Sequence, residues 1–151
     1  CLSRGLGDVY KRQMIDVERI VPNGIVCLFN AWAYHQLSTV VPPSICVAID
    51  AKRKVVIPST VPIEIYYWKK ENLEFGITDA EISGFKVRIT DLERSVCDAV
   101  KYRNKIGLDT TAEIIRNYLK KDKRNLSRLS EYAKRLRVAN TLKNYLMIAI
   151  E

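Results

Sequence analysis

No apolar run in this sequence approaches the ~20 residues that a membrane-spanning helix needs, so we expect no membrane partner. The sequence also lacks the glycine-rich loops that hold phosphates, the His-Glu-x-x-His pair of zinc proteases and the Gly-x-Ser-x-Gly motif of hydrolases. A single histidine and the absence of Cys-x-x-Cys spacing leave little material for a metal site. We therefore predict no cofactor and no metal.

Cysteines are few and do not form a disulfide pattern. Cys27, Cys46 and Cys97 each lie among apolar neighbours, which favours buried thiols in a reducing cytoplasm. His35 ends an apolar segment without a cluster of ligand residues, so we predict that it packs or caps a helix.

The first thirteen residues differ in character from the rest. Ser3 to Gln13 matches the translation of a transposase adapter used in DNA sequencing libraries. A genuine basic arm is the alternative, and a signal peptide is not supported because the segment has no apolar core. We predict that residues 1–13 are non-native and that residues 14–151 form one domain.

Positive charge is concentrated in the last third of the chain. Residues 14–100 carry 9 basic and 11 acidic side chains, whereas residues 101–151 carry 13 basic and 5 acidic ones, and the whole chain has a net charge of +8. Such an asymmetric charge favours an anionic partner, either nucleic acid or an acidic protein surface. The alternative is a set of solvated basic helix faces.

Strand-like and helical patterns occupy different parts of the chain. Residues 24–36 are apolar nearly all round, which predicts a buried helix with Asn23 as a possible N-cap. Alternation and β-branched content then predict strands at 45–49, 55–57 and 62–68, and a hairpin at 76–90 with its turn at Ser83-Gly84.

Four short helices are predicted after the hairpin. The first begins with a capping box formed by Thr90 and Glu93 and ends near Gly107. Asp109 and Asn125 can cap the second and third, and the last follows Asn140. This order predicts an α+β fold: a small antiparallel or mixed sheet, a buried N-terminal helix and a C-terminal layer of about four short helices.

A few carboxylates occupy positions that could support chemistry. Asp50-Ala51-Lys52 follows an apolar strand, as the Mg²⁺-binding acid and the lysine do in some nucleases, but a charged turn between strands is the favoured interpretation. Asp91 and Glu93 are explained by capping, and Asp98 lies four residues after Arg94, which predicts an ion pair on one helix face.

Two stretches of the sequence carry a family likeness. Residues 21–39 (VPNGIVCLFNAWAYHQLST) are followed by 42–49 (PPSICVAI), and residues 89–109 (ITDLERSVCDAVKYRNKIGLD) by 113–116 (EIIR). Together they resemble the C-terminal region of AbiEi-type antitoxins from type IV, abortive-infection toxin–antitoxin systems. The likeness covers nearly all of residues 15–150, and KYRNKIGLD (101–109) is its most specific element.

The resemblance implies a non-enzymatic antitoxin and transcriptional-regulator domain for phage defence. It implies a nucleotidyltransferase-like toxin as functional partner, and promoter DNA bound by a winged helix that the thirteen leading residues replace here. The main alternatives are a small basic nucleic-acid-binding domain and a Mg²⁺-dependent nuclease that uses Asp50 and Lys52.

The candidate contact residues are the basic side chains of the last third. Their expected role is to attract phosphates or an acidic toxin surface, without reading bases. Tyr102 and Tyr118 could stack on bases, although half-buried positions are favoured. The candidates are Lys101, Arg103, Lys105, Arg116, Lys120, Lys121, Lys123, Arg124, Arg128, Lys134 and Arg135.

Overall fold

The fold is α+β, as predicted, and is built on a mixed sheet. The computed structural model describes residues 15–40, 44–82 and 84–150, so the adapter-like segment and Ser83 lie outside the described residues. Within them, five strands have the order β3-β2-β1-β5-β4. Pairing is antiparallel for β1–β2 and β4–β5 and parallel for β1–β5 and β2–β3. The strands are β1 (Ile25–Val26), β2 (Ile45–Asp50), β3 (Ile63–Trp68), β4 (Ile77–Ile82) and β5 (Phe85–Thr90).

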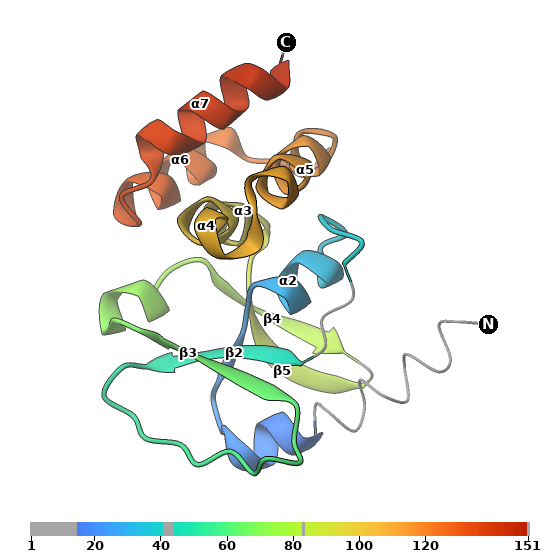
Figure 1. Cartoon of the computed structure of the whole chain (residues 1–151), viewed down its shortest axis with the longest axis vertical. Helices are drawn as coiled ribbons and strands as arrows, with labels where there is room; N and C mark the ends of the chain where they lie inside the picture. Colours follow the sequence, from blue (N-terminus) through green and yellow to red (C-terminus); the bar gives the residue numbers. More distant parts are fainter. Residues whose placement is uncertain (1–14, 41–43, 83, 151) are drawn as a thin grey trace, which may run out of the picture.

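The helices form layers on the sheet. A helical segment at residues 15–20 packs below it, while α2 and α3 lie above it, and α5, α6 and α7 form the outermost layer (Figure 1). No helix in the described ranges is long and apolar enough to cross a membrane. The helices are α2 (Phe29–Tyr34), the short 3-10 helix η1 (Lys70–Leu73), α3 (Leu92–Lys101), α4 (Arg103–Ile106), α5 (Leu108–Leu119), α6 (Leu126–Arg135) and α7 (Ala139–Ile150).

Both faces of the central strands are covered. Because side chains alternate along a strand, Cys46 and Ala48 face the helical core, whereas Ile45, Val47 and Ile49 face the segment at residues 15–20. This two-sided burial explains why β2 has a continuous apolar sequence.

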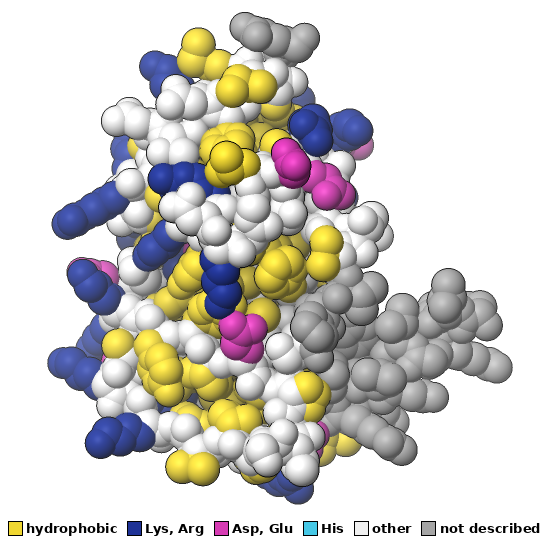
Figure 2. Space-filling view, in the orientation of Figure 1, with side chains coloured by type: hydrophobic (Ala, Val, Ile, Leu, Met, Phe, Trp, Pro, Cys, Tyr) yellow, Lys and Arg dark blue, Asp and Glu magenta, His cyan; other side chains and the backbone are white. Residues whose placement is uncertain are grey.

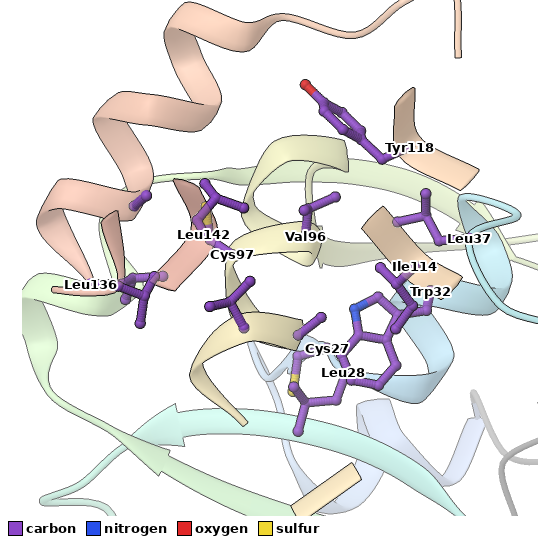
Figure 3. Packing of buried hydrophobic residues seen from close by; sticks show 14 of the residues in the cluster. Cys27, Leu28, Trp32, Leu37, Val96, Cys97, Ile114, Tyr118, Leu136 and Leu142 are labelled. Atoms are coloured by element: carbon purple, nitrogen blue, oxygen red, sulfur yellow. The ribbon is translucent and has the colours of Figure 1, made fainter. Parts of the chain in front are cut away.

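The main core lies between the sheet and the helices. Figure 3 shows Leu28 and Trp32 beside Cys27, with Val96 and Cys97 of α3 in the layer above them. The Trp32 indole N–H donates to the carbonyl oxygen of Ser95 at 2.8 Å, which fixes α2 against α3. Cys27, Cys46 and Cys97 are free and buried, as predicted, and burial raises the pKa of the Cys46 thiol to about 11.

The predicted helix at residues 24–36 is partly wrong. Residues 25 and 26 form β1 between β2 and β5, and the helix begins only at Phe29. Asn23 does not cap it, because Asn23 has φ 63° in the preceding turn and Leu28 occupies the N-cap position. A run that is apolar on every side fits a buried strand as well as a buried helix, so periodicity could not separate the two.

Other local predictions need smaller corrections. The hairpin and the strands at 45–49 and 62–68 are confirmed, but residues 55–57 are not a strand. Val55 and Ile57 instead lie in an irregular segment and pack against the apolar cluster between β2 and the helical segment at residues 15–20. Their apolar side chains are explained by this packing, without strand pairing.

The helix starts show where short polar side chains are used. Asp91, not Thr90, caps α3, since its carboxylate accepts from the Arg94 backbone N–H at 2.8 Å. Asn125 caps α6 as predicted. Gly107, not Asp109, precedes α5, and α7 begins at Ala139, before Asn140. The described residues after β5 form five helices rather than about four. The first predicted helix is divided at Tyr102 into α3 and α4.

Candidate anion-binding surface

The candidate residues are arranged around α3, which is buried from Glu93 to Val100. Its start contacts the end of α5 and the start of α6, and its last residue, Lys101, lies at the opposite end. At 1.5 Å per residue, Glu93 and Lys101 are roughly 12 Å apart along the helix. The basic side chains therefore fall into groups near different ends of one buried helix.

A buried guanidinium holds the middle of α3 in place. Arg94 Nε donates to Asp98 at 3.1 Å, and both side chains are 1% exposed. Arg94 Nη1 donates to the carbonyl oxygens of Asn72 and Phe75 at 2.7 and 3.0 Å. The guanidinium also lies 4.5 Å from the centroid of the Trp68 ring and 4.4 Å from that of Phe75. The predicted Arg94–Asp98 pair is confirmed, and it is structural.

A second carboxylate joins three helices at the start of α3. Glu93 does not complete a capping box; it is buried and accepts a hydrogen bond from the Tyr118 hydroxyl at 2.9 Å. The backbone N–H of Asn125 donates to Glu93 and to the Tyr118 hydroxyl oxygen at 3.2 and 3.0 Å. Arg128 Nη1 lies 3.7 Å from Glu93 Oε1, so the candidate contact residue Arg128 already has an ion-pair partner within the chain.

Five cations surround the connection between α5 and α6. All are exposed except Lys121, which is half-buried. Arg124 donates to the Lys121 carbonyl oxygen at 2.8 Å, which steadies the backbone of the connection. We call this set the link cluster: Arg116, Lys120, Lys121, Lys123 and Arg124.

A cavity of about 540 Å³ opens near the other end of α3. Two candidates, Lys101 and Arg135, line it together with Lys69 and Arg137. Glu71 is the one acidic residue among its described lining residues. Partial burial lowers the pKa of Lys101, and the nearby charges of Arg94 and Lys69 act in the same direction.

Sequence reasoning missed two of these four cations. Lys69 lies between β3 and η1, in the part of the chain whose net charge is negative. Counting charges by region therefore did not select it. Arg137 was left out of the candidate set although it belongs to the basic last third. Arg137 lies just after α6, where glycine is the usual residue, and its place in the basic last third is the signal that could have found it.

Three other candidates have local roles or positions. The Lys105 ammonium donates to Glu64 and to the Tyr66 hydroxyl at 2.9 and 2.7 Å, so it fastens α4 to β3. Its hydrogen bond also lowers the pKa of Glu64. Arg103 donates to the Val100 carbonyl oxygen at 2.9 Å, and Lys134 is exposed on α6.

The aromatic candidates lie mainly inside. Tyr118 is fully buried, and its hydroxyl is held by Glu93. Tyr102 is half-buried, and its hydroxyl accepts from the Trp68 indole N–H at 3.0 Å. The half-buried position predicted for Tyr102 is thus confirmed. Tyr118 is more deeply buried than predicted.

Basic side chains are visible on more than one side of the molecule, including the upper right of the view near α5, where acidic side chains lie beside them (Figure 2). Figure 2 shows Lys and Arg down the left side of the view, from α6 past η1 to the connection between β2 and β3, where few acidic side chains are visible. Only three of the eleven candidates form ion pairs within the described part of the chain: Lys105 with Glu64, Arg128 with Glu93, and Arg135 with Glu131.

Asp50 is engaged in a turn. Its carboxylate accepts from the Lys52 backbone N–H at 2.8 Å, which is the charged-turn arrangement that the sequence favoured. Among the residues described, no group of three or more His, Cys, Asp or Glu side chains could hold a metal ion.

Comparison with known proteins adds no relative. No protein-family model matches the chain, and no match was found among curated proteins. The resemblance to AbiEi-type antitoxins therefore stays a prediction.

Proposed function

We propose that this chain is a non-enzymatic antitoxin domain that counters a nucleotidyltransferase-like toxin, with the link cluster as its contact with an anionic partner. The observation that carries the proposal is the state of the basic side chains. Within the described residues, eight of the eleven candidates form no ion pair with a carboxylate, although they stand on ordered helices and their connections. Their charge is available to a partner.

The carboxylates support a binding role over a catalytic one. Asp91 caps α3 and also accepts from the Tyr132 hydroxyl at 3.0 Å. Glu93 and Asp98 are buried with helix partners, and Asp50 closes a turn. Each carboxylate that the sequence offered for chemistry thus has a structural task in this fold.

The test is co-expression of the 151-residue chain with a nucleotidyltransferase-like toxin. We expect the wild-type chain to relieve growth arrest. A variant with Lys120, Lys121, Lys123 and Arg124 changed to Gln should lose at least about tenfold in rescued colonies, because each lost contact to an anion weakens binding.

A matched control removes the same charge elsewhere. Lys52, Lys54, Lys86 and Arg88 are exposed cations of the sheet region, and their change to Gln should leave the rescue intact. Equal loss in both variants would contradict a specific contact at the link cluster. Failure of the wild-type chain to rescue would contradict the antitoxin function itself. If rescue requires bound nucleic acid, the anionic partner of the link cluster is nucleic acid and not the toxin.

A further inference from the structure

The cavity at the end of α3 collects cations from three separate segments. Lys69 directly follows β3, and Lys101 ends α3. Arg135 ends α6, and Arg137 lies in the turn that follows it. Glu71 is the single carboxylate in the described lining, so the local charge is strongly positive. Residues this far apart in the sequence meet here only because of the fold.

The carboxylates nearby offset the charge of these cations only in part. Asp98 is fully buried, and its Oδ1 atom is held by Arg94. Arg135 is 3.4 Å from Glu131, but both side chains are more than half exposed, so the pair is weak. Lys69, Lys101 and Arg137 form no ion pair with any residue of the described chain. Burial is the main cause of the lowered pKa of Lys101; Asp98 opposes it, and the charges of Arg94 and Lys69 add to it.

Arg137 has a backbone conformation that is costly for arginine. Its φ of 61° lies in the left-handed region, just after the end of α6, where glycine is the usual residue. The turn is closed by hydrogen bonds from Arg137 N–H to the Lys134 carbonyl and from Val138 N–H to the Ala133 carbonyl. Strain of this kind is commonly kept at functional positions, and here the side chain lines the cavity.

Two of the aromatic rings that line the cavity, Trp68 and Phe75, are covered by guanidinium groups, whereas Tyr67 is 53% exposed. The Arg94 guanidinium stacks on Trp68 and Phe75, and the Arg135 guanidinium lies 5.1 Å from the centroid of Phe75. A nucleobase would have to displace these cations to stack on Trp68 or Phe75. The four cations therefore make anionic charge the main feature that the cavity can recognise, and the exposed Tyr67 ring is a place where a base could stack without displacing a guanidinium group.

We propose that this cavity binds a compact polyphosphate group, such as inorganic tripolyphosphate or the triphosphate of a nucleotide. Two guanidinium groups can each donate paired hydrogen bonds to phosphate oxygens, and two ammonium groups add point charges. The volume of about 540 Å³ lies within the usual range for small-molecule sites. This inference is independent of the proposed function, because it concerns the cavity and not the link cluster.

The experiment is isothermal titration of the 151-residue chain, at low salt, with tripolyphosphate, ATP and AMP. We expect tripolyphosphate and ATP to bind, and AMP to bind at least about tenfold more weakly because it carries fewer charges. Equal affinity for tripolyphosphate and ATP would assign the site to the polyphosphate chain alone. Tighter binding of ATP would assign it to a nucleotide, and both results uphold the proposal.

Two variants separate binding from folding. Arg137→Gly should weaken tripolyphosphate binding about tenfold while the urea midpoint of unfolding stays the same or rises, because glycine adopts a φ of 61° without strain. Lys101→Gln should weaken binding similarly. The control Arg88→Gln removes an exposed cation of β5 and should leave binding unchanged. No tripolyphosphate binding, or equal loss in the control, would overturn the proposal.

Discussion

Arg94 is the residue on which the centre of the molecule depends most. Its side chain is 1% exposed, and its guanidinium joins α3 to η1 and to the segment between η1 and β4. Gly76, with φ 67°, lies against it, and a Cβ atom there would meet Arg94 Cβ at 2.6 Å. The i,i+4 spacing to Asp98 predicted the ion pair, but nothing in the spacing of charges revealed its burial or its carbonyl partners.

We expect Arg94→Met to lower the free energy of unfolding by about 3–5 kcal/mol, because it leaves the buried Asp98 carboxylate without its partner. Urea denaturation followed by circular dichroism measures the loss. Arg88→Met, at an exposed position of β5, is the control and should change stability by less than about 0.5 kcal/mol. If Arg94→Met does not fold, Arg94→Lys should still show a partial loss. A loss below about 1 kcal/mol in Arg94→Met would contradict the expectation.

His35 confers a pH dependence whose sign follows from its position. It caps the end of α2, as predicted, and its Nε2–H donates to the Thr90 carbonyl oxygen at 2.8 Å. Burial lowers the pKa of His35, and the charge of Lys121 acts in the same direction, while the Thr90 carbonyl, Asp91 and Glu93 oppose it. The folded chain therefore takes up this proton less readily than the unfolded chain.

The stability contributed by His35 is fully present above its unfolded pKa of about 6.5 and is lost as pH falls toward its lower folded value. We expect the free energy of unfolding to fall below pH 6.5, by at most about 1.4 kcal/mol per pH unit for one proton. His35 is the only histidine, so His35→Gln should flatten this part of the curve. Urea titrations from pH 5 to 8 measure both proteins, and an unchanged slope in His35→Gln would be contrary to this account.

Among the elements, strands with alternating or β-branched sequences were predicted well, whereas the segment around β1 was not. The hairpin of β4 and β5 and the strands β2 and β3 follow from local pattern. Two residues of β1 become a strand only because β2 and β5 pair with them from both sides. Such a tertiary requirement cannot be read from a short apolar run.

The joint between α3, α5 and α6 is also a tertiary feature. Sequence patterns predicted each of these helices and the Asn125 cap. They did not predict that Glu93 accepts a hydrogen bond from the Tyr118 hydroxyl instead of completing a capping box. The local capping signal was outweighed by a contact between residues 25 positions apart.

Tyr118→Phe tests this joint. Removal of the hydroxyl leaves the buried Glu93 with fewer donors, so the free energy of unfolding should fall by about 1–3 kcal/mol. The backbone N–H of Asn125, which donates to both groups, should exchange with deuterium faster. Tyr67→Phe on the exposed side of β3 is the control for the loss of a hydroxyl. Unaltered exchange at Asn125 would show that the joint does not depend on Tyr118.

For the whole molecule, counting charges by region predicted where positive charge lies along the chain but not where it gathers in space. The last third carries most of it, and the link cluster belongs to that third. The cavity instead combines Lys101, Arg135 and Arg137 with Lys69, which comes from the acidic part of the sequence. Only the fold, which brings the end of β3 beside the turn after α6, creates this second group.

Electrostatic attraction to a polyanion should depend on which face loses charge. With duplex DNA as probe, we expect the logarithm of the affinity to fall linearly with the logarithm of salt concentration, by about 0.9 per phosphate contact. Changing Lys120, Lys121, Lys123 and Arg124 to Gln should reduce this slope by about 3, because these side chains, exposed except for the half-buried Lys121, form no ion pairs with the described residues.

The same substitution at Lys52, Lys54, Lys86 and Arg88 should reduce the slope by less than about 1, although the net charge changes equally. Fluorescence anisotropy across a salt series measures both variants beside the wild-type chain. Equal reductions would mean that the DNA responds to net charge alone and that the link cluster is no preferred face. A slope near zero for the wild-type chain would remove charge as the basis of binding altogether.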